Sequence, residues 1–143
     1  MQAGNTTDRR KNSTHLINNM LDERKQLLAL LMQLSELDGD NPDESDGELV
    51  QEFCQVLVDY IAAGHFGLYQ RIASGTERRK EVVQLSKSIY RDIEKTTQAA
   101  LDFNEKYDIE NRNLSGLPRD LSSLGEQLTT RIELEDQLIA RLL

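Results

Sequence analysis

The sequence contains one cysteine, two prolines, two histidines and no tryptophan among its 143 residues. The single cysteine, Cys54, can form no disulfide within the chain, so we expect a reducing cytoplasm as its compartment. No stretch approaches the roughly eighteen consecutive apolar residues of a membrane-spanning helix. The start of the chain, MQAGNTTDRRKN, has no apolar core of the kind that a secretory signal needs. The sequence therefore predicts a protein without a membrane contact.

Lysine and arginine are absent between Gln26 and Gln70, a stretch that holds nine acidic residues. The net charge of the whole chain is −8, and most of it comes from this stretch. A field of this sign repels nucleic acid and attracts basic surfaces. We therefore expect no direct nucleic-acid partner, and a basic protein surface as the more suitable one.

The scarcity of proline and of aromatic residues favours helices over sheets. Four segments carry apolar residues at helical spacing. The first follows a cap at Ser13 or Thr14 and leaves residues 1–13 as a flexible N-terminus. An acidic loop at about 38–47 separates it from the second segment, which covers about 48–73. Gly75 can end the helix of this segment, and Thr76 can cap the next one. The third covers about 77–106, and the fourth begins at Pro118.

Each segment has an apolar stripe that predicts its buried face. The stripes are Leu16, Met20, Leu27, Leu31 and Leu34; Phe53, Leu57, Tyr60, Gly64 and Leu68; Val82, Leu85, Ile89, Ile93, Ala100 and Phe103; and Leu121, Leu124, Leu128, Ile132, Leu138 and Leu142. Four helices with modest loops predict an all-α fold, an antiparallel up-down four-helix bundle in a single domain over 1–143.

The first helix is apolar over more of its circumference than one buried stripe requires. Beside the stripe lies a shoulder at helical spacing, which consists of Ile17, Leu21, Leu28 and Met32. One interpretation makes this helix the most buried of the four. The other makes the shoulder a docking surface, because contiguous exposed apolar patches commonly mark interaction sites.

The stretch DYIAAGHF raises the same question for the second helix. Phe66 and Tyr69 fall away from the predicted stripe, on a side that also carries Asp59, Ala62 and Ala63. An exposed aromatic anchor with a charged rim is typical of protein interfaces. The alternative is a phenylalanine packed beneath a neighbouring loop.

The sequence offers little for catalysis or metal binding. A hemerythrin-like metal-binding bundle would need several inward-facing histidines and carboxylates, and His15 and His65 are the only histidines. A phosphorelay domain would need a basic residue after its histidine, whereas FGLY follows His65. Because His65 lies at the border of the predicted stripe, we expect it to be a structural histidine. In the acidic loop, Pro42 and Asp43 break the EF-hand pattern. We expect no enzyme, no cofactor and no metal.

The segment FCQVLVDYIAAGHFGLY (Phe53 to Tyr69) resembles the signature of the Rsd/AlgQ family of bacterial anti-sigma factors. The resemblance extends to IELEDQLI on the fourth helix and, in spacing, to HLINNMLDER on the first. It covers about residues 14–142. Family members usually carry Asp-Arg-Trp-Leu where this sequence reads NNML, so Met20 stands in place of the tryptophan.

This resemblance implies a helical bundle that binds region 4 of the primary sigma factor, with one copy of each protein. Binding would sequester the sigma factor from the RNA polymerase core and from promoter DNA. The family's contact positions correspond here to Leu16, Ile17, Met20, Leu21, Asp59, Ala62 and Phe66. On this interpretation, Phe66 lies outside the core because it contacts the partner.

Overall fold

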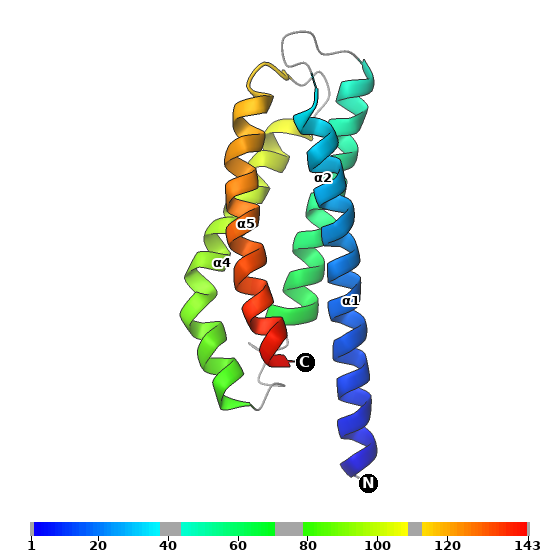
Figure 1. Ribbon diagram of the computed structural model, residues 1–143, viewed down its shortest axis with the longest axis vertical. Coiled ribbons are helices and arrows are strands. Elements are labelled where there is room, and N and C mark those ends of the chain that lie inside the picture. Colours follow the sequence, from blue (N-terminus) through cyan, green and yellow to red (C-terminus); the bar gives the residue numbers. More distant parts are fainter. Residues whose placement is uncertain (1, 38–43, 71–78, 109–112, 143) are drawn as a thin grey trace.

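The computed structural model describes residues 2–37, 44–70, 79–108 and 113–142, with side chains from residue 14 onward except at 44 and 45. These residues form four long helices and one π-helical turn, with no strand among them: α1 (Gln2–Ser35), α2 (Glu44–Gly64), η1 (His65–Tyr69), α4 (Lys80–Tyr107) and α5 (Leu117–Leu142). The predicted all-α four-helix fold is confirmed. Figure 1 shows the chain rising through α1, descending through α2, rising through α4 and descending through α5.

The first helix is longer than its sequence predicts. It begins at Gln2, so the start expected after a cap at Ser13 or Thr14 is wrong, while the flexibility expected for residues 1–13 stays a prediction. No proline lies between Gln2 and Ser35, and the residues before Ser13 allow the helical backbone to continue. In Figure 1 these first turns of α1 extend beyond the ends of the other helices.

The remaining boundaries lie within a few residues of the expected ones. Helix α2 begins at Glu44, inside the predicted acidic loop, and α5 begins one residue before Pro118, where proline fits the first turn. The predicted helix end at residue 73 and the punctuation at Gly75 and Thr76 lie outside the described residues.

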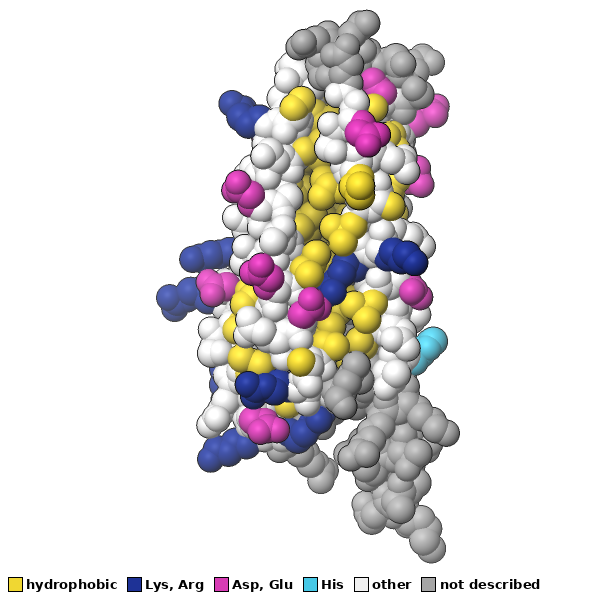
Figure 2. Space-filling model, in the orientation of Figure 1, with side chains coloured by type: hydrophobic (Ala, Val, Ile, Leu, Met, Phe, Trp, Pro, Cys, Tyr) yellow, Lys and Arg dark blue, Asp and Glu magenta, His cyan; other side chains and the backbone are white. Residues whose placement is uncertain are grey.

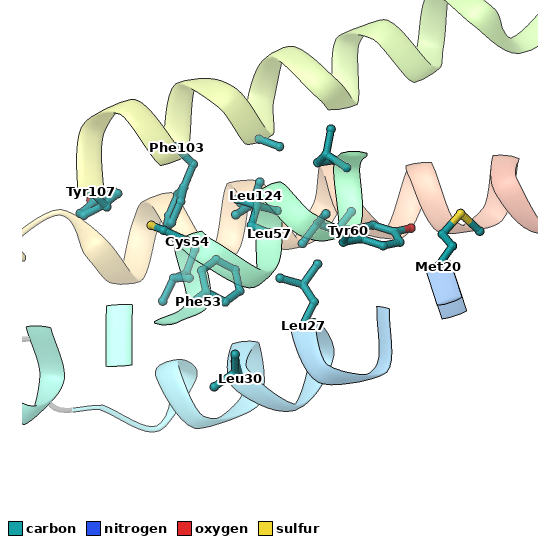
Figure 3. Packing of buried hydrophobic residues seen from close by; sticks show 14 of the residues in the cluster. Met20, Leu27, Leu30, Phe53, Cys54, Leu57, Tyr60, Phe103, Tyr107 and Leu124 are labelled. Carbon is teal, nitrogen blue, oxygen red and sulfur yellow. The ribbon is translucent and has the colours of Figure 1, made fainter. Parts of the chain in front are cut away.

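The core lies along the axis of the bundle. Phe53 of α2 and Phe103 of α4 meet edge to face, with ring centroids 5.6 Å apart. Figure 3 shows Phe53, Leu57 and Leu27 pointing into the space between the helices. The stripe predicted for the second helix is confirmed, because all five of its residues are buried. On α4, Leu85 is half-buried and the other stripe residues are buried.

The buried face of α1 differs from the predicted stripe on both of its flanks. Met20, Leu27 and Leu34 are buried as expected, but Leu16 and Leu31 are only half-buried. Ile17 and Leu30 are buried instead, at 2% and 7% exposure. Helix α1 packs far more extensively against α2 than against α5. Ile17 and Leu30 lie about 140° apart at helical spacing, on opposite flanks of the stripe, so the buried face is wider than predicted.

Candidate functional site

The segment that carries the family resemblance ends in a π-helical turn. In η1 the backbone N–H of Gln70 donates to the carbonyl of His65, five residues earlier, and the preceding Gly64 keeps helical dihedral angles. Such wide turns within an α-helix are rare and occur frequently at functional sites. Phe66 lies in this turn with 62% of its surface exposed, and its ring meets that of His65 edge to face at 5.0 Å. The prediction that Phe66 points outward is confirmed.

The same turn explains one of two wrong predictions. Tyr69, expected to point outward, is 8% exposed. One extra residue in a turn delays the angular position of all that follow by about 100°, which brings Tyr69 back to the core side. The second concerns His65, which was expected as a structural histidine at the border of the core: it is exposed and lines a groove between α2 and α4.

Asp59 and Ala62 share a helical face with Phe66. Asp59 is exposed and accepts a hydrogen bond of 3.2 Å from Nε2 of Gln55, one turn earlier. Ala62 is half-buried and presents no bulk that would hinder an approaching surface. The structure therefore brings together the three predicted site residues of the second helix.

The predicted site residues of α1 do not form one exposed face. Ile17 and Met20 are buried, at 2% and 1% exposure, so they cannot be surface contacts in this conformation. For Met20 the cause is the close packing of α1 on α2: a Cβ placed on Gly64 would lie 3.5 Å from Sδ of Met20. Leu16 is half-buried beside η1: a Cβ placed on Gly67 would lie 3.3 Å from Cβ of Leu16.

Leu21 belongs to a different surface. It shares a face of α1 with Leu28 and Met32, which are 37% and 67% exposed, and Met32 lines a depression between α1 and α5. Figure 2 shows apolar side chains exposed along this seam between the two helices. Three of the four shoulder residues are therefore at least partly exposed, whereas Ile17 belongs to the core.

A buried polar cluster occupies the centre of the bundle, and the sequence reasoning missed it. On α5, Nε of Arg131 pairs with Oε2 of Glu135 at 3.0 Å, and the two residues are 1% and 0% exposed. Tyr60 donates its hydroxyl hydrogen to Glu135, and Nη2 of Arg24 reaches the same carboxylate oxygen at 3.1 Å. One carboxylate thus joins α1, α2 and α5.

The fourth helix joins this cluster through hydroxyl groups. Nη1 of Arg131 donates to Oγ1 of Thr96 at 3.2 Å and to Oγ1 of Thr97 at 2.7 Å. Burial, together with the negative charge of Glu135, raises the pKa of Tyr60 above its ordinary value. A signal was present: Arg131 and Glu135 lie three residues beyond Leu128 and three before Leu138, in phase with the stripe.

The charged side chains of this cluster form ion pairs with one another. Its two arginines face Glu135 and, through Nη1 of Arg24 at 2.8 Å, Asp136. Because breaking one partner would leave a buried charge uncompensated, such a cluster fixes how the helices fit together. Among the described residues, no group of three or more histidine, cysteine or acidic side chains is placed to hold a metal ion. Within the same residues, no helix has the length and hydropathy needed to cross a membrane.

Comparisons with protein-family models and with curated proteins identify the same family. Residues 1–143 match the family model described as "Regulator of RNA polymerase sigma(70) subunit, Rsd/AlgQ". Curated proteins named "Regulator of sigma D" from Shigella dysenteriae serotype 1, Shigella boydii serotype 4 and Escherichia coli K12 are each 33% identical to the chain over 146 residues. Each alignment covers 96% of this chain and 90% of the relative.

No solved structure matches the chain. The family match covers the whole sequence, and the exposed Phe66 lies within the segment that carries the resemblance. The chain belongs to the Rsd/AlgQ family, whose description is that of regulators of the sigma(70) subunit of RNA polymerase.

Proposed function

We propose that this protein is an anti-sigma factor that binds region 4 of the primary sigma factor with one-to-one stoichiometry. Bound region 4 is then withheld from the RNA polymerase core and from promoter DNA. The observation that carries the proposal is the exposed ring of Phe66, which an isolated bundle has no structural need to leave in water.

The proposed contact surface consists of Leu16, Asp59, Ala62 and Phe66, and we call it the anchor surface. Phe66 supplies most of its apolar area. Covering the exposed part of this ring contributes about 2 kcal/mol before the costs of association. Leu16 adds a half-buried apolar side chain beside η1.

Charge favours a basic partner at the anchor surface. Glu48, Glu52 and Asp59 are exposed on α2, and no lysine or arginine lies between Gln26 and Gln70. A DNA-binding module such as region 4 carries the opposite charge, so long-range attraction speeds the encounter and disfavours acidic competitors.

Ile17 and Met20 support this surface from beneath. Both are buried, and Met20 lies against Gly64 of α2, so they keep the exposed residues in position without reaching the partner. Met20 lies where family members usually have a tryptophan, and the flexible thioether side chain fills such an irregular space well. Leu21 faces the α5 side and is not part of the proposed surface.

The proposal can be tested by measuring binding of isolated sigma region 4 to purified variants. Phe66→Ala should weaken binding about tenfold or more, since a central aromatic anchor contributes about 2 kcal/mol. Met32→Ala is the matched control, because Met32 is equally exposed, at 67%, but faces α5. It should leave the affinity unchanged.

A charge-reversal pair tests the electrostatic part. Asp59→Lys should weaken binding, whereas Glu133→Lys, an exposed position on α5, should have little effect although it changes the net charge equally. Circular dichroism checks that each variant remains helical. Unchanged binding in Phe66→Ala and Asp59→Lys would exclude the anchor surface, and failure of the unaltered protein to bind region 4 would exclude the function itself.

A further inference from the structure

A groove of about 840 Å³ runs between α2 with η1 on one side and α4 on the other. Among the described residues, six large apolar side chains are exposed, and four of them line this groove: Val58, Phe66, Tyr90 and Leu101. The volume lies within the range of about 300–1,000 Å³ that is typical of small-molecule sites, which occur between the helices of bundles. The groove is therefore a ligand-sized apolar space.

The floor of the groove is rigid. Ile61, Tyr69, Ile93 and Arg131 line it, and each is less than a tenth exposed. Arg131 is held by Glu135, Thr96 and Thr97, so the floor cannot rise to fill the space without breaking a buried ion pair. Ala62 lines the groove on the α2 side, where its small side chain leaves space for a ligand.

The charges along the groove differ in sign from those of the chain as a whole. The chain carries a net charge of −8, yet Arg91, Lys95 and Arg131 line the groove against one carboxylate, Glu94. Arg131 is already paired with Glu135, but Arg91 and Lys95 are exposed and lie one turn apart on α4. One wall of an apolar groove therefore presents two cations at neighbouring positions.

We propose that this groove binds a small molecule with an apolar body and one anionic group, a carboxylate or a phosphate. The apolar body lies against Val58, Phe66, Tyr90 and Leu101, and the anion lies beside Arg91 and Lys95. The basic module assigned to the anchor surface does not suit these cations, so the groove is a separate site that shares only the edge formed by Ala62 and Phe66.

Calorimetric titration of the full chain with decanoate, below the concentration at which it forms micelles, tests the proposal. Decanoate should bind saturably with one molecule per chain. Acetate, which lacks the apolar body, should not bind, and decyltrimethylammonium, which reverses the charge, should bind at least about tenfold more weakly. Decyl phosphate in place of decanoate distinguishes the two anionic groups.

Matched variants locate the site. Lys95→Glu should weaken decanoate binding at least about tenfold, whereas Lys25→Glu, on the outer face of α1, should stay within about twofold. Leu101→Ala should weaken binding while Met32→Ala should not.

Three results would overturn the proposal: no saturable binding, equal binding of the cationic amphiphile, or equal effects of Lys95→Glu and Lys25→Glu. Loss of sigma region 4 binding in Leu101→Ala, without decanoate binding to the unaltered protein, would instead identify the groove as a protein-docking surface. Failure of region 4 to bind would leave the decanoate result unaffected, so the two proposals are tested separately.

Discussion

At the scale of single residues, Glu135 connects three of the four long helices. Its side chain is fully buried and receives hydrogen bonds from Tyr60, Arg24 and Arg131, which come from three different helices. Space for it exists because Gly64 has no side chain: a Cβ there would lie 3.1 Å from Oε2 of Glu135 and 3.3 Å from Nη2 of Arg131. Gly64 is thus required by packing, since its dihedral angles are ordinary helical ones.

We expect Gly64→Ala to destabilise the protein by about 1–3 kcal/mol, because the added methyl group forces a fully buried ion pair to shift. Urea unfolding followed by circular dichroism measures the change in the free energy of unfolding.

Gly125→Ala is the control for this prediction. A Cβ at Gly125 would meet nothing within 4 Å, and the residue lies in the interior of α5. Alanine should therefore stabilise the helix by about 0.5–1 kcal/mol. Equal effects of the two substitutions would show that helix propensity, and not contact with Glu135, governs Gly64.

At the scale of elements, the π-helical turn decides which aromatic residue is exposed. A regular helix would place both Phe66 and Tyr69 outside the core. The extra residue in η1 leaves Phe66 exposed and turns Tyr69 inward, where the guanidinium carbon of Arg131 lies 5.6 Å from its ring centroid. The turn therefore joins the anchor surface to the buried polar cluster.

The junction of α4 and α5 has its own electrostatic lock. Oδ2 of Asp120, in the first turn of α5, accepts hydrogen bonds from Nζ of Lys106 at 2.6 Å and from the hydroxyl of Tyr107 at 2.5 Å. The hydrogen bond from Lys106, followed by that from Tyr107, holds the pKa of Asp120 below its ordinary value. The negative charge of Asp120 also interacts favourably with the positive, N-terminal end of the α5 helix dipole.

This lock predicts a dependence of stability on pH. Because the pKa is lower in the folded state, the contribution of Asp120 is present above its unfolded pKa, near 3.8, and is lost as the pH falls through the folded pKa. Asp120→Asn should lower stability at pH 7 by about 0.5–1 kcal/mol, the range of a largely exposed pair. It should also reduce the loss of stability in acid.

Urea unfolding at a series of pH values between 2 and 7 provides the measurement, at about one-unit intervals. Asp92→Asn, an exposed position on α4, is the comparison. If both variants lose stability in acid as steeply as the unaltered protein does, Asp120 makes no contribution.

At the scale of the whole molecule, charge is separated between surfaces. The stretch from Gln26 to Gln70 is acidic and contains no lysine or arginine, while Arg91 and Lys95 on α4 line the groove. The protein thus presents surfaces of opposite sign on either side of Phe66. This arrangement suits two partners of different charge.

The acidic stretch predicts how salt affects sigma binding. Raising the salt concentration from about 0.05 to 0.5 M should lower the association rate constant with region 4 about tenfold or more, because screening removes long-range attraction. The dissociation rate constant should change much less, since the contacts proposed for Phe66 and Leu16 are short-range and apolar. Stopped-flow mixing measures the association rate constant, and surface binding measures the dissociation rate constant. An association rate constant that does not change with salt concentration would contradict a role for the acidic stretch.

Much of this architecture follows from local pattern. The stripe Phe53, Leu57, Tyr60 and Leu68 is buried because helical spacing alone puts these residues on one face. Phe66 is exposed for the same reason. Residues at the edge of a stripe were predicted less well: Ile17 is buried and Leu16 only half-buried, because burial there depends on how the other helices pack around α1.

The sequence by itself determined the four helices, the central part of each buried face, the acidic stretch and the family. These properties depend on composition and on the spacing of neighbours along one helix. Tertiary structure alone decided the burial of Arg131 and Glu135, the inward turn of Tyr69 and the groove beside α4. Each of these requires atoms from helices far apart in the chain to meet, and a polar residue is buried only where such partners satisfy it.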